Sequence, residues 1–263
     1  MHEVSGTASS GTVPSGTLLL VPNALDLGSE AVPLDEVLSA GALRRAAALG
    51  HWVVEDARSA RGFLKRVGAF VPLARPLQEI HIAELPRPPK GRATPAPPEA
   101  WRALLGPALA GHDLGLLSEA GLPAVADPGA TLVAAAHDAG LRVWPLAGAS
   151  AILLALAASG MDGQSFAFVG YLPQESAARA ARLRELEALS ARLRQTQVFI
   201  ETPYRNAAML ETALAALSPR TRLAVACGLT LPQGFVRSAA VSAWRGAPVV
   251  LPDRLPAVFA LQA

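Results

Sequence analysis

The loop from Ser118 to Gly129 holds the residue types and spacing that most favour ligand chemistry. It contains two glycines, two prolines and two carboxylates, and it lies between the apolar run 114–117 and a helical pattern over 130–139. In an open α/β sheet the carboxyl ends of the strands meet helix N-termini, and backbone amides bind ligands there. Glycine and proline also mark ordinary strand-to-helix turns. The loop is therefore either a ligand site or a plain connection, and it is the first place to look for function.

Two more loops follow predicted strands of the first half and would converge on the same sheet edge. Segment 22–28 begins at Pro22 and lacks the Gly-x-Gly-x-x-Gly spacing of dinucleotide-binding proteins. Segment 145–151 places small residues, ending in Ser150 and Ala151, before a predicted helix. Small residues let a backbone approach a ligand closely, and they equally permit tight packing of a helix on a sheet.

In the second half, Glu201, Thr202, Pro203, Tyr204 and Arg205 follow a predicted strand and begin a helix. Glu201 and Thr202 precede the proline, so they suit helix capping as well as ligand contact. Tyr204 and Arg205 suit either an ordinary surface turn or a substrate-side edge. We take Glu201 and Arg205 as candidates for orienting a substrate, and the sequence assigns no catalytic base.

The composition indicates a globular protein of one large domain or two small ones. The chain has 263 residues, of which 51% are hydrophobic and 17% charged. This balance supports a buried core and argues against long disorder. Aromatic residues make up only 5%, which argues against an RNA-binding platform of stacked rings.

Positive charge comes mainly from arginine, but a net charge of +2 is too small to imply a polyanionic partner by itself. A run of arginines lies in a predicted helix over 176–193, with Glu185 and Glu187 among them. The run is either a solvated helix face with internal ion pairs or an RNA contact. The candidates for that contact are Arg179, Arg182 and Arg184.

Cysteine and histidine give no sign of a metal. Cys227 is the only cysteine, so one chain can form no disulfide or cysteine-based metal site, and a reducing compartment is the simplest fit. The five histidines show no ligand spacing, and we predict no metal. They are His2, His51, His81, His112 and His137.

The first residues are rich in serine, threonine and glycine, and we expect residues 1–16 to be a mobile tail. The stretch has no basic n-region, and the apolar run 18–21 is too short for a signal peptide or a membrane span. We therefore expect a cytoplasmic protein that does not enter a membrane.

Apolar runs alternate with helical patterns through the first half, which predicts a mostly parallel sheet with helices on both faces. From residue 166 onward the pattern predicts a smaller α+β domain with antiparallel pairs. We place the boundary at the turn 161–163, which gives domains 17–162 and 163–263. Strands are predicted over 17–21, 51–54, 77–82, 114–117, 141–145, 166–169, 197–200, 223–227, 234–237 and 257–261. Helices are predicted over 34–49, 57–67, 98–110, 130–139, 151–158, 176–193 and 203–217, and a proline-rich surface loop over 86–98.

Six blocks, in order along the chain, resemble the motifs of the tetrapyrrole methylase superfamily. The resemblance is closest to the bacterial branch that methylates a cytidine ribose 2'-hydroxyl of small-subunit rRNA. That branch carries S-D-A-G-T-P-x-I-S-D-P-G where this chain has 118–129, and Y-E-S/T-x-H-R where it has 200–205. The blocks are Leu20–Pro22, Val54–Arg58, Ser118–Gly129, Pro145–Ala151, Gly170–Pro173 and Ile200–Arg205.

The resemblance implies an α/β protein of two domains, an N-terminal mostly parallel sheet and a C-terminal α+β domain, with S-adenosylmethionine in the cleft between them. It also implies a homodimer. Backbone groups would hold the cofactor, so small residues matter more there than charged ones. Asp127-Pro128-Gly129 would mainly cap the following helix and shape the loop. Carried over by position, the cofactor-binding candidates are Pro22, Gly121, Leu122, Pro123, Val125, Ser150, Ala151, Ile200, Glu201, Thr202, Pro256 and Ala257.

Some polar positions of those motifs differ here. Glu119 and Leu122 stand where the branch has aspartate and threonine, and Tyr204 stands where it has histidine. Three hypotheses follow: a methyltransferase that acts on RNA, one that acts on a tetrapyrrole-like or other small molecule, or a cofactor-binding relative without catalysis. The arginines of 176–193 favour the first, and the lost polar residues favour the other two.

Overall fold

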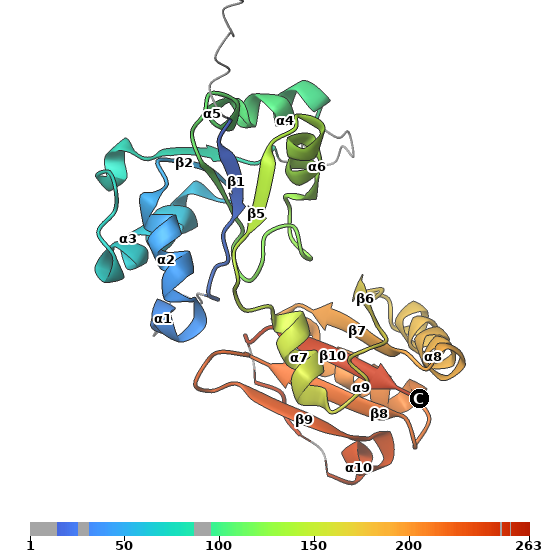
Figure 1. Ribbon diagram of the computed structural model, residues 1–263. Coiled ribbons are helices and arrows are strands. Elements are labelled where there is room, and N and C mark those ends of the chain that lie inside the picture. Colours follow the sequence, from blue (N-terminus) through green and yellow to red (C-terminus); the bar gives the residue numbers. More distant parts are fainter. Residues whose placement is uncertain (1–14, 26–31, 87–95, 248, 253) are drawn as a thin grey trace, which may run out of the picture. The chain divides into compact units, whose positions relative to one another are not determined.

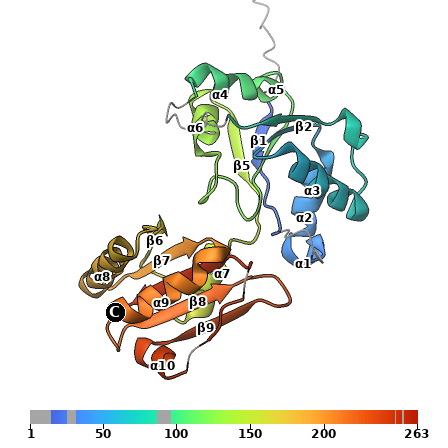
Figure 2. The same cartoon turned by 180° about the vertical axis from the view of Figure 1, so that it is seen from behind.

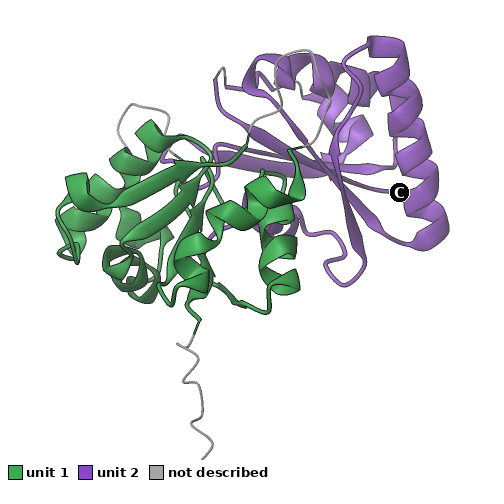
Figure 3. Cartoon of the chain, turned by 90° about the horizontal axis from the view of Figure 1, so that it is seen from above, with its two compact units in different colours: residues 1–26, 33–148 green, residues 27–32, 149–263 purple. Residues whose placement is uncertain are grey.

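The computed structural model describes residues 15–25, 32–86, 96–247, 249–252 and 254–263. These residues form two compact units, one of 15–25 and 33–148 and the other of Val32 and 149–263, coloured green and purple in Figure 3. Parts of three segments from the sequence analysis lie outside the described residues. They are most of the expected tail, the end of segment 22–28 from Asp26 to Gly28, and most of the expected proline-rich loop.

The first unit is built on a five-stranded sheet in which all neighbouring strands are parallel, as predicted. Its spatial order is β3-β2-β4-β1-β5. The strands are β1 (Thr17–Leu20), β2 (His51–Val54), β3 (His81–Glu84), β4 (Leu114–Leu117) and β5 (Arg142–Pro145). Side chains alternate between the two faces, so both faces of each buried strand need cover.

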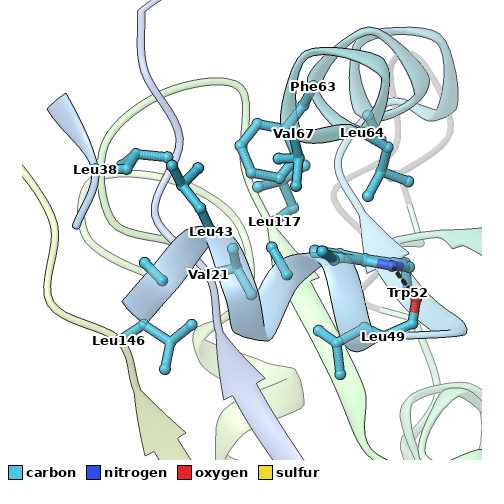
Figure 4. Packing of buried hydrophobic residues seen from close by; sticks show 14 of the residues in the cluster. Val21, Leu38, Leu43, Leu49, Trp52, Phe63, Leu64, Val67, Leu117 and Leu146 are labelled. Carbon is cyan, nitrogen blue, oxygen red and sulfur yellow. Dashed lines mark hydrogen bonds between the residues drawn. The ribbon is translucent and has the colours of Figure 1, made fainter. Parts of the chain in front are cut away.

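Helices supply that cover on both faces of the first sheet (Figures 1 and 2). On one face, α1 (Leu34–Val37), α2 (Ala40–Ala48), α3 (Ala57–Phe70) and the turn η1 (Leu77–Glu79) pack around Leu19 and Trp52. Figure 4 shows this cluster, in which the Trp52 indole also donates a hydrogen bond of 3.3 Å to the Leu49 carbonyl. On the other face, α4 (Pro98–Leu104), α5 (Gly106–Leu109) and α6 (Ala130–Asp138) pack around Leu18 and Val53.

The second unit has a mixed five-stranded sheet in the order β6-β7-β10-β8-β9. Only β6 and β7 are parallel, and the other neighbours are antiparallel. The strands are β6 (Phe166–Tyr171), β7 (Thr196–Glu201), β8 (Arg222–Cys227), β9 (Phe235–Ala240) and β10 (Ala257–Gln262). Helices α8 (Ser176–Leu193), α9 (Asn206–Ala216) and α10 (Val241–Gly246) cover one face, and α7 (Ala151–Ser159) covers the other.

Three local departures from the sequence prediction have physical causes. The expected helix 34–49 is split, because Leu38 is extended and pairs with Gly148, while the Ser39 hydroxyl accepts from the Ala42 amide and starts α2. The expected strand 77–82 is a 3₁₀ turn followed by β3, which begins at His81 in register with His51. The short helix α10 was not predicted, because its six residues are too few to show a clear helical period of apolar residues.

The division of the chain also differs from the boundary placed at 161–163. The first unit ends at Gly148, and α7 packs its residues Ile152, Ala155 and Leu156 on the second sheet. The sequence of α7 is apolar on every side, so its periodicity does not show which sheet it covers.

Three histidines whose spacing in the sequence did not indicate a shared site lie together at the amino ends of strands in the first sheet. The ring centroids of His51 and His81 are 5.0 Å apart, and those of His51 and His112 are 5.1 Å apart. The pKa of His51 is lowered from its ordinary 6.5 by burial first, then by His81, His112 and Arg75. A cavity of about 290 Å³ is lined in part by His51 and His81. Burial and these neighbours therefore favour the neutral form of the His51 imidazole.

We expect the protein to lose stability as the pH falls below 6.5. In that range the unfolded chain binds a proton at His51 more readily than the folded chain does, so the free energy of unfolding decreases. Urea unfolding of the wild type and of His51→Gln between pH 7.5 and 5.5 checks this, and the variant should show the weaker pH dependence. The exposed His137→Gln is the control. Equal pH dependence in the wild type and His51→Gln would contradict the assignment.

Candidate functional site

The carboxyl edge of the first sheet has a topological switch between β1 and β4. These two strands are neighbours, but the chain leaves β1 towards β2 and leaves β4 towards β5, which lie on opposite sides. The two connections therefore separate onto opposite faces and leave space at the strand ends, where open α/β sheets bind ligands. Segment 22–28, of which the structure describes 22–25, follows β1, and Ser118–Gly129 follows β4.

Asn23 ties these two segments together. Its side-chain amide donates to the carbonyls of Ser118 and Glu119, each at 3.0 Å. Its backbone exchanges two hydrogen bonds of 2.9 Å with Gly121. Asn23 is buried, so its bonds are shielded from water and fix the loop after β4 against the end of β1. The sequence motif did not single out Asn23 for this role.

Gly121 has open space beside its backbone. Its φ is +70°, and a Cβ added there would meet nothing within 4 Å. Ala124 and Ala126 also have positive φ, which L-residues rarely adopt. Of the other candidates in this loop, Pro123 is buried, Leu122 is half-buried, and Val125 is 44% exposed. The strained, open backbone fits a surface that a ligand approaches closely.

Pro22 is buried rather than open, and it lies against Gly148. A Cβ added at Gly148 would be 2.2 Å from the Pro22 Cβ. The small residue at 148 therefore serves close packing of two strand-end loops, which was one of the two explanations left open for segment 145–151.

Carboxylates gather at the same edge. The Glu119 amide donates to Glu55 Oε2 at 3.3 Å, and the Ser59 hydroxyl donates to Glu119 Oε1 at 2.6 Å. The pKa of Asp127 is raised from 3.8 to about 6, by burial first and then by Glu55, with a smaller upward effect of Glu119; a hydrogen bond with Ser118 acts in the opposite direction. The tripeptide expected to cap α6 contains its N-cap, which is Gly129, and no side chain of that residue can bond the helix start.

We expect Asp127→Asn to stabilise the first unit at neutral pH by about 1 kcal/mol, a value reduced for partial exposure to solvent. The pKa of about 6 lies above the ordinary 3.8, so the folded state loses stability as the pH rises from about 4 to about 6 and carries the full cost above that. Urea unfolding at pH 7.5 and pH 4 measures the gain, which should vanish at the lower pH. The exposed Asp138→Asn, which also removes a carboxylate, is the control; a similar gain there would contradict the explanation.

In the second unit, Glu201 at the end of β7 holds Arg205. Glu201 Oε1 accepts from Arg205 Nε at 2.8 Å and Nη2 at 2.6 Å, and from the Thr202 amide at 2.7 Å and its hydroxyl at 3.2 Å. The Glu201 side chain is fully buried, whereas that of Arg205 is 19% exposed. The hydrogen bonding that Arg205 donates to Glu201 is the main cause that raises the pKa of Arg205. Glu201 and Arg205, the two candidates for orienting a substrate, are thus bonded to each other.

Two buried acceptor oxygens at this strand end have no hydrogen-bond donor among the residues that the structure describes. They are Glu201 Oε2 and Asn206 Oδ1, although the Asn206 amide donates to the Leu255 carbonyl at 2.7 Å. Glu201 pairs in register with Ala257 of β10, two residues beyond Leu255, so both oxygens belong to the same region. Buried acceptors without donors are costly, and a ligand that brings N–H or O–H groups would relieve that cost.

The other candidates of the second unit lie on three elements. Ile200 and Thr202 flank Glu201, Ala257 is buried at the start of β10, and the Pro256 carbonyl accepts from Gly228 at 3.0 Å. Ser150 is the buried N-cap of α7 without a side-chain cap bond, and Ala151 is exposed on its first turn.

Arg179 is not a surface residue, which corrects its expected place in an RNA contact. It is 6% exposed, and its guanidinium donates to the Thr212 hydroxyl at 3.0 and 2.8 Å and to the Gln174 carbonyl. Arg179 therefore joins α8 to α9. Arg182 pairs with Glu185 at 2.6 Å, and Arg184 is exposed, as the solvated-face interpretation of this helix predicts.

Within the described parts of the chain, no group of three histidine, cysteine, aspartate or glutamate side chains is arranged so that it could hold a metal ion. No helix there has both the length and the apolar character needed to cross a bilayer.

Comparison with known proteins relates the chain to methyltransferases. The family model "Tetrapyrrole (Corrin/Porphyrin) Methylases" matches residues 42–242. Ribosomal RNA small subunit methyltransferase I of Mesorhizobium japonicum is 36% identical over 189 residues, which are 72% of this chain and 58% of that protein. The protein of the same name from Micromonospora olivasterospora is 46% identical over 119 residues, which are 45% of this chain and 37% of that protein. The chain thus spans less than two thirds of the length of either relative.

Among solved structures, uroporphyrin-III-C-methyltransferase from Thermus thermophilus has a TM-score of 0.50 and 20% identity, and the match covers 95% of this chain and 92% of that one. At that identity the likeness shows the fold alone.

Proposed function

Because the chain belongs to the tetrapyrrole (corrin/porphyrin) methylases, we propose that it is an S-adenosylmethionine-dependent methyltransferase. The observation that carries the proposal is the edge after β4, where Gly121 offers an open backbone at the switch point inside the family's ordered motif. The cofactor supplies a methyl group on a sulfonium, which passes to the acceptor in an in-line displacement.

The residues present fit such a cofactor. The positive φ and free space at Gly121 leave backbone groups accessible to a ligand, and the unpartnered oxygens of Glu201 and Asn206 match a ligand that carries N–H or O–H donors. The candidate positions for holding it are Gly121, Leu122, Pro123 and Val125 in the first unit. In the second unit they are Ser150, Ala151, Ile200, Glu201, Thr202, Pro256 and Ala257. Pro22 supports the loop through Gly148.

In this mechanism the chain contributes alignment more than acid–base chemistry. In-line transfer requires the acceptor atom to lie on the axis of the breaking bond, so rigid positioning supplies much of the acceleration. The bonds of Asn23 to Ser118 and Glu119 hold the loop after β4 rigid in the first unit, and the Glu201–Arg205 pair holds the end of β7 rigid in the second. Glu201 and Arg205 orient the acceptor, and we assign no catalytic base.

We propose that the acceptor is RNA, and specifically small-subunit rRNA. The two curated relatives that are 36% and 46% identical are named for that substrate, whereas the neighbour named for uroporphyrin is 20% identical. A homodimer, which rests on the family resemblance, and a cytoplasmic location, which rests on the sequence, accompany this proposal.

Two measurements test the proposal in sequence. Calorimetric titration with S-adenosylmethionine should give a saturable heat and raise the Tm. Radiolabelled methyl transfer is then compared between small-subunit rRNA and a uroporphyrinogen. Transfer to the rRNA is expected, transfer to the porphyrinogen alone would replace the substrate, and a protein that binds no cofactor would refute the activity. Sedimentation velocity of the same sample tests the homodimer.

A further inference from the structure

We infer that Tyr171 and Tyr204 form a stacking surface for an unpaired nucleobase of the acceptor RNA, with the fixed guanidinium of Arg205 beside them. The inference rests on the proposed function and names which part of the RNA the second unit recognises. The acceptor it requires is a single-stranded or extruded nucleotide.

The only two tyrosines of the chain come from separate segments to one strand end. Tyr171 ends β6 and pairs in register with Ile200 of the parallel strand β7, and Tyr204 follows four residues later in the turn η2 (Pro203–Arg205). Parallel strands bring their carboxyl ends to the same edge, so the register itself places both residues there. Their exposed fractions are 56% and 81%, among the largest of the apolar side chains in the described residues.

Arg205 lies beside the ring of Tyr204. Its guanidinium carbon lies 5.5 Å from the centre of the Tyr204 ring, and the hydrogen bond that it donates to Glu201 is the main cause that raises its pKa. The double hydrogen bond from Arg205 to the buried Glu201 fixes the plane of the guanidinium. A fixed planar cation can stack on a base or meet a phosphate without losing further side-chain entropy.

Exposed aromatic rings beside an arginine suit an unpaired base better than other RNA features. A base presents a π-face that a tyrosine can stack on, whereas the grooves of an A-form duplex do not admit such contacts. The overall aromatic content of 5% argues against a broad platform of stacked rings. A site for one or two bases needs only the two tyrosine rings at this strand end. The exposed aromatic Phe166 lies at the opposite end of β6.

The test measures binding of a fluorescein-labelled single-stranded RNA of ten nucleotides by anisotropy. Loss of one stacked base weakens binding by about tenfold or more, so Tyr204→Ala and Tyr171→Ala should each weaken it by about that factor. Tyr204→Phe keeps the ring and should bind within about twofold of the wild type, because stacking needs no hydroxyl. Phe166→Ala, at the other end of the same strand, is the matched control and should bind like the wild type.

A second probe separates stacking from charge. Heparin carries negative charge without bases, so its affinity should be unchanged in the two alanine variants. Equal weakening for heparin and RNA, or unchanged RNA binding in both alanine variants, would overturn the inference. So would variants that alter self-association in sedimentation while RNA binding stays constant, because the tyrosines would then contact a second copy of the chain.

The proposed function and this inference fail in different ways. Cofactor binding is measured separately by calorimetry on the same variants, and it should not change because neither tyrosine is a cofactor candidate. A wild type that binds RNA but no S-adenosylmethionine refutes the methyltransferase and leaves the stacking surface supported. A wild type that binds the cofactor and transfers methyl, with RNA binding indifferent to both tyrosines, refutes the stacking surface alone.

Discussion

Replacement of Gly121 by tryptophan is expected to abolish S-adenosylmethionine binding, with a loss of at least about a hundredfold in affinity. Gly121 has φ +70°, and a Cβ added there would have no atom within 4 Å. A large side chain would therefore occupy the space that the ligand needs, and it would also strain the backbone. A loss of two decades corresponds to about 2.8 kcal/mol. Calorimetric titration of the variant measures it.

Gly140 offers a closely matched control. It also has φ +70° and no atom within 4 Å of an added Cβ, but it connects α6 to β5 at the amino edge of the sheet. Gly140→Trp should therefore carry the same backbone strain and bind the cofactor normally. If both variants lose binding equally, strain is the cause and the edge after β4 is not the site.

Replacement of Arg205 by alanine is expected to lower the free energy of unfolding by more than the loss of an exposed ion pair does. It would leave the carboxylate of Glu201 without its cation, and breaking one side of a buried ion pair is costly because a buried charge is left uncompensated. The side chain of Glu201 is 0% exposed with Arg205 in place. Urea unfolding measures the loss, and Glu201→Gln combined with Arg205→Leu should recover part of it.

The pair of Arg182 and Glu185 is the control for burial. Its N–O distance is also 2.6 Å, but the side chains are 34% and 59% exposed. Arg182→Ala should cost less than about 1 kcal/mol, because exposed ion pairs are screened by water. Losses of equal size at Arg205 and Arg182 would show that burial does not set the strength of the first pair.

Much of the fold could be predicted because its elements carry local signals. The strands β2 and β4 were predicted with their observed bounds, since each is a short apolar run between turn residues. Helix α8 was also predicted with its observed bounds, and the Glu175 carboxylate that caps it bonds the amides of Ala177 and Ala178. The split at Leu38 was not predicted, because it depends on pairing with Gly148, far along the chain.

Some features of the candidate site could likewise be predicted from local sequence, and others could not. The loop 118–129 was found from its glycines, prolines and position after a buried strand, all of which are local features. The burial of Arg179 and the meeting of His51, His81 and His112 were not predicted. Each depends on which segments pack together, and a single sequence does not encode that in its spacing.

The sequence by itself determined the family, the alternation of strands and helices, and the loops at the strand ends, because glycine, proline and apolar periodicity act over a few residues. Only the tertiary structure decided that Asn23 locks the loop after β4, that Glu201 holds Arg205, and that the buried oxygens Glu201 Oε2 and Asn206 Oδ1 lack donors among the described residues. The register of β6 on β7 likewise placed Tyr171 at the strand end that Tyr204 follows. Hydrogen bonds and burial between segments distant in sequence arise from the packed fold, so they are fixed only when the sheets assemble.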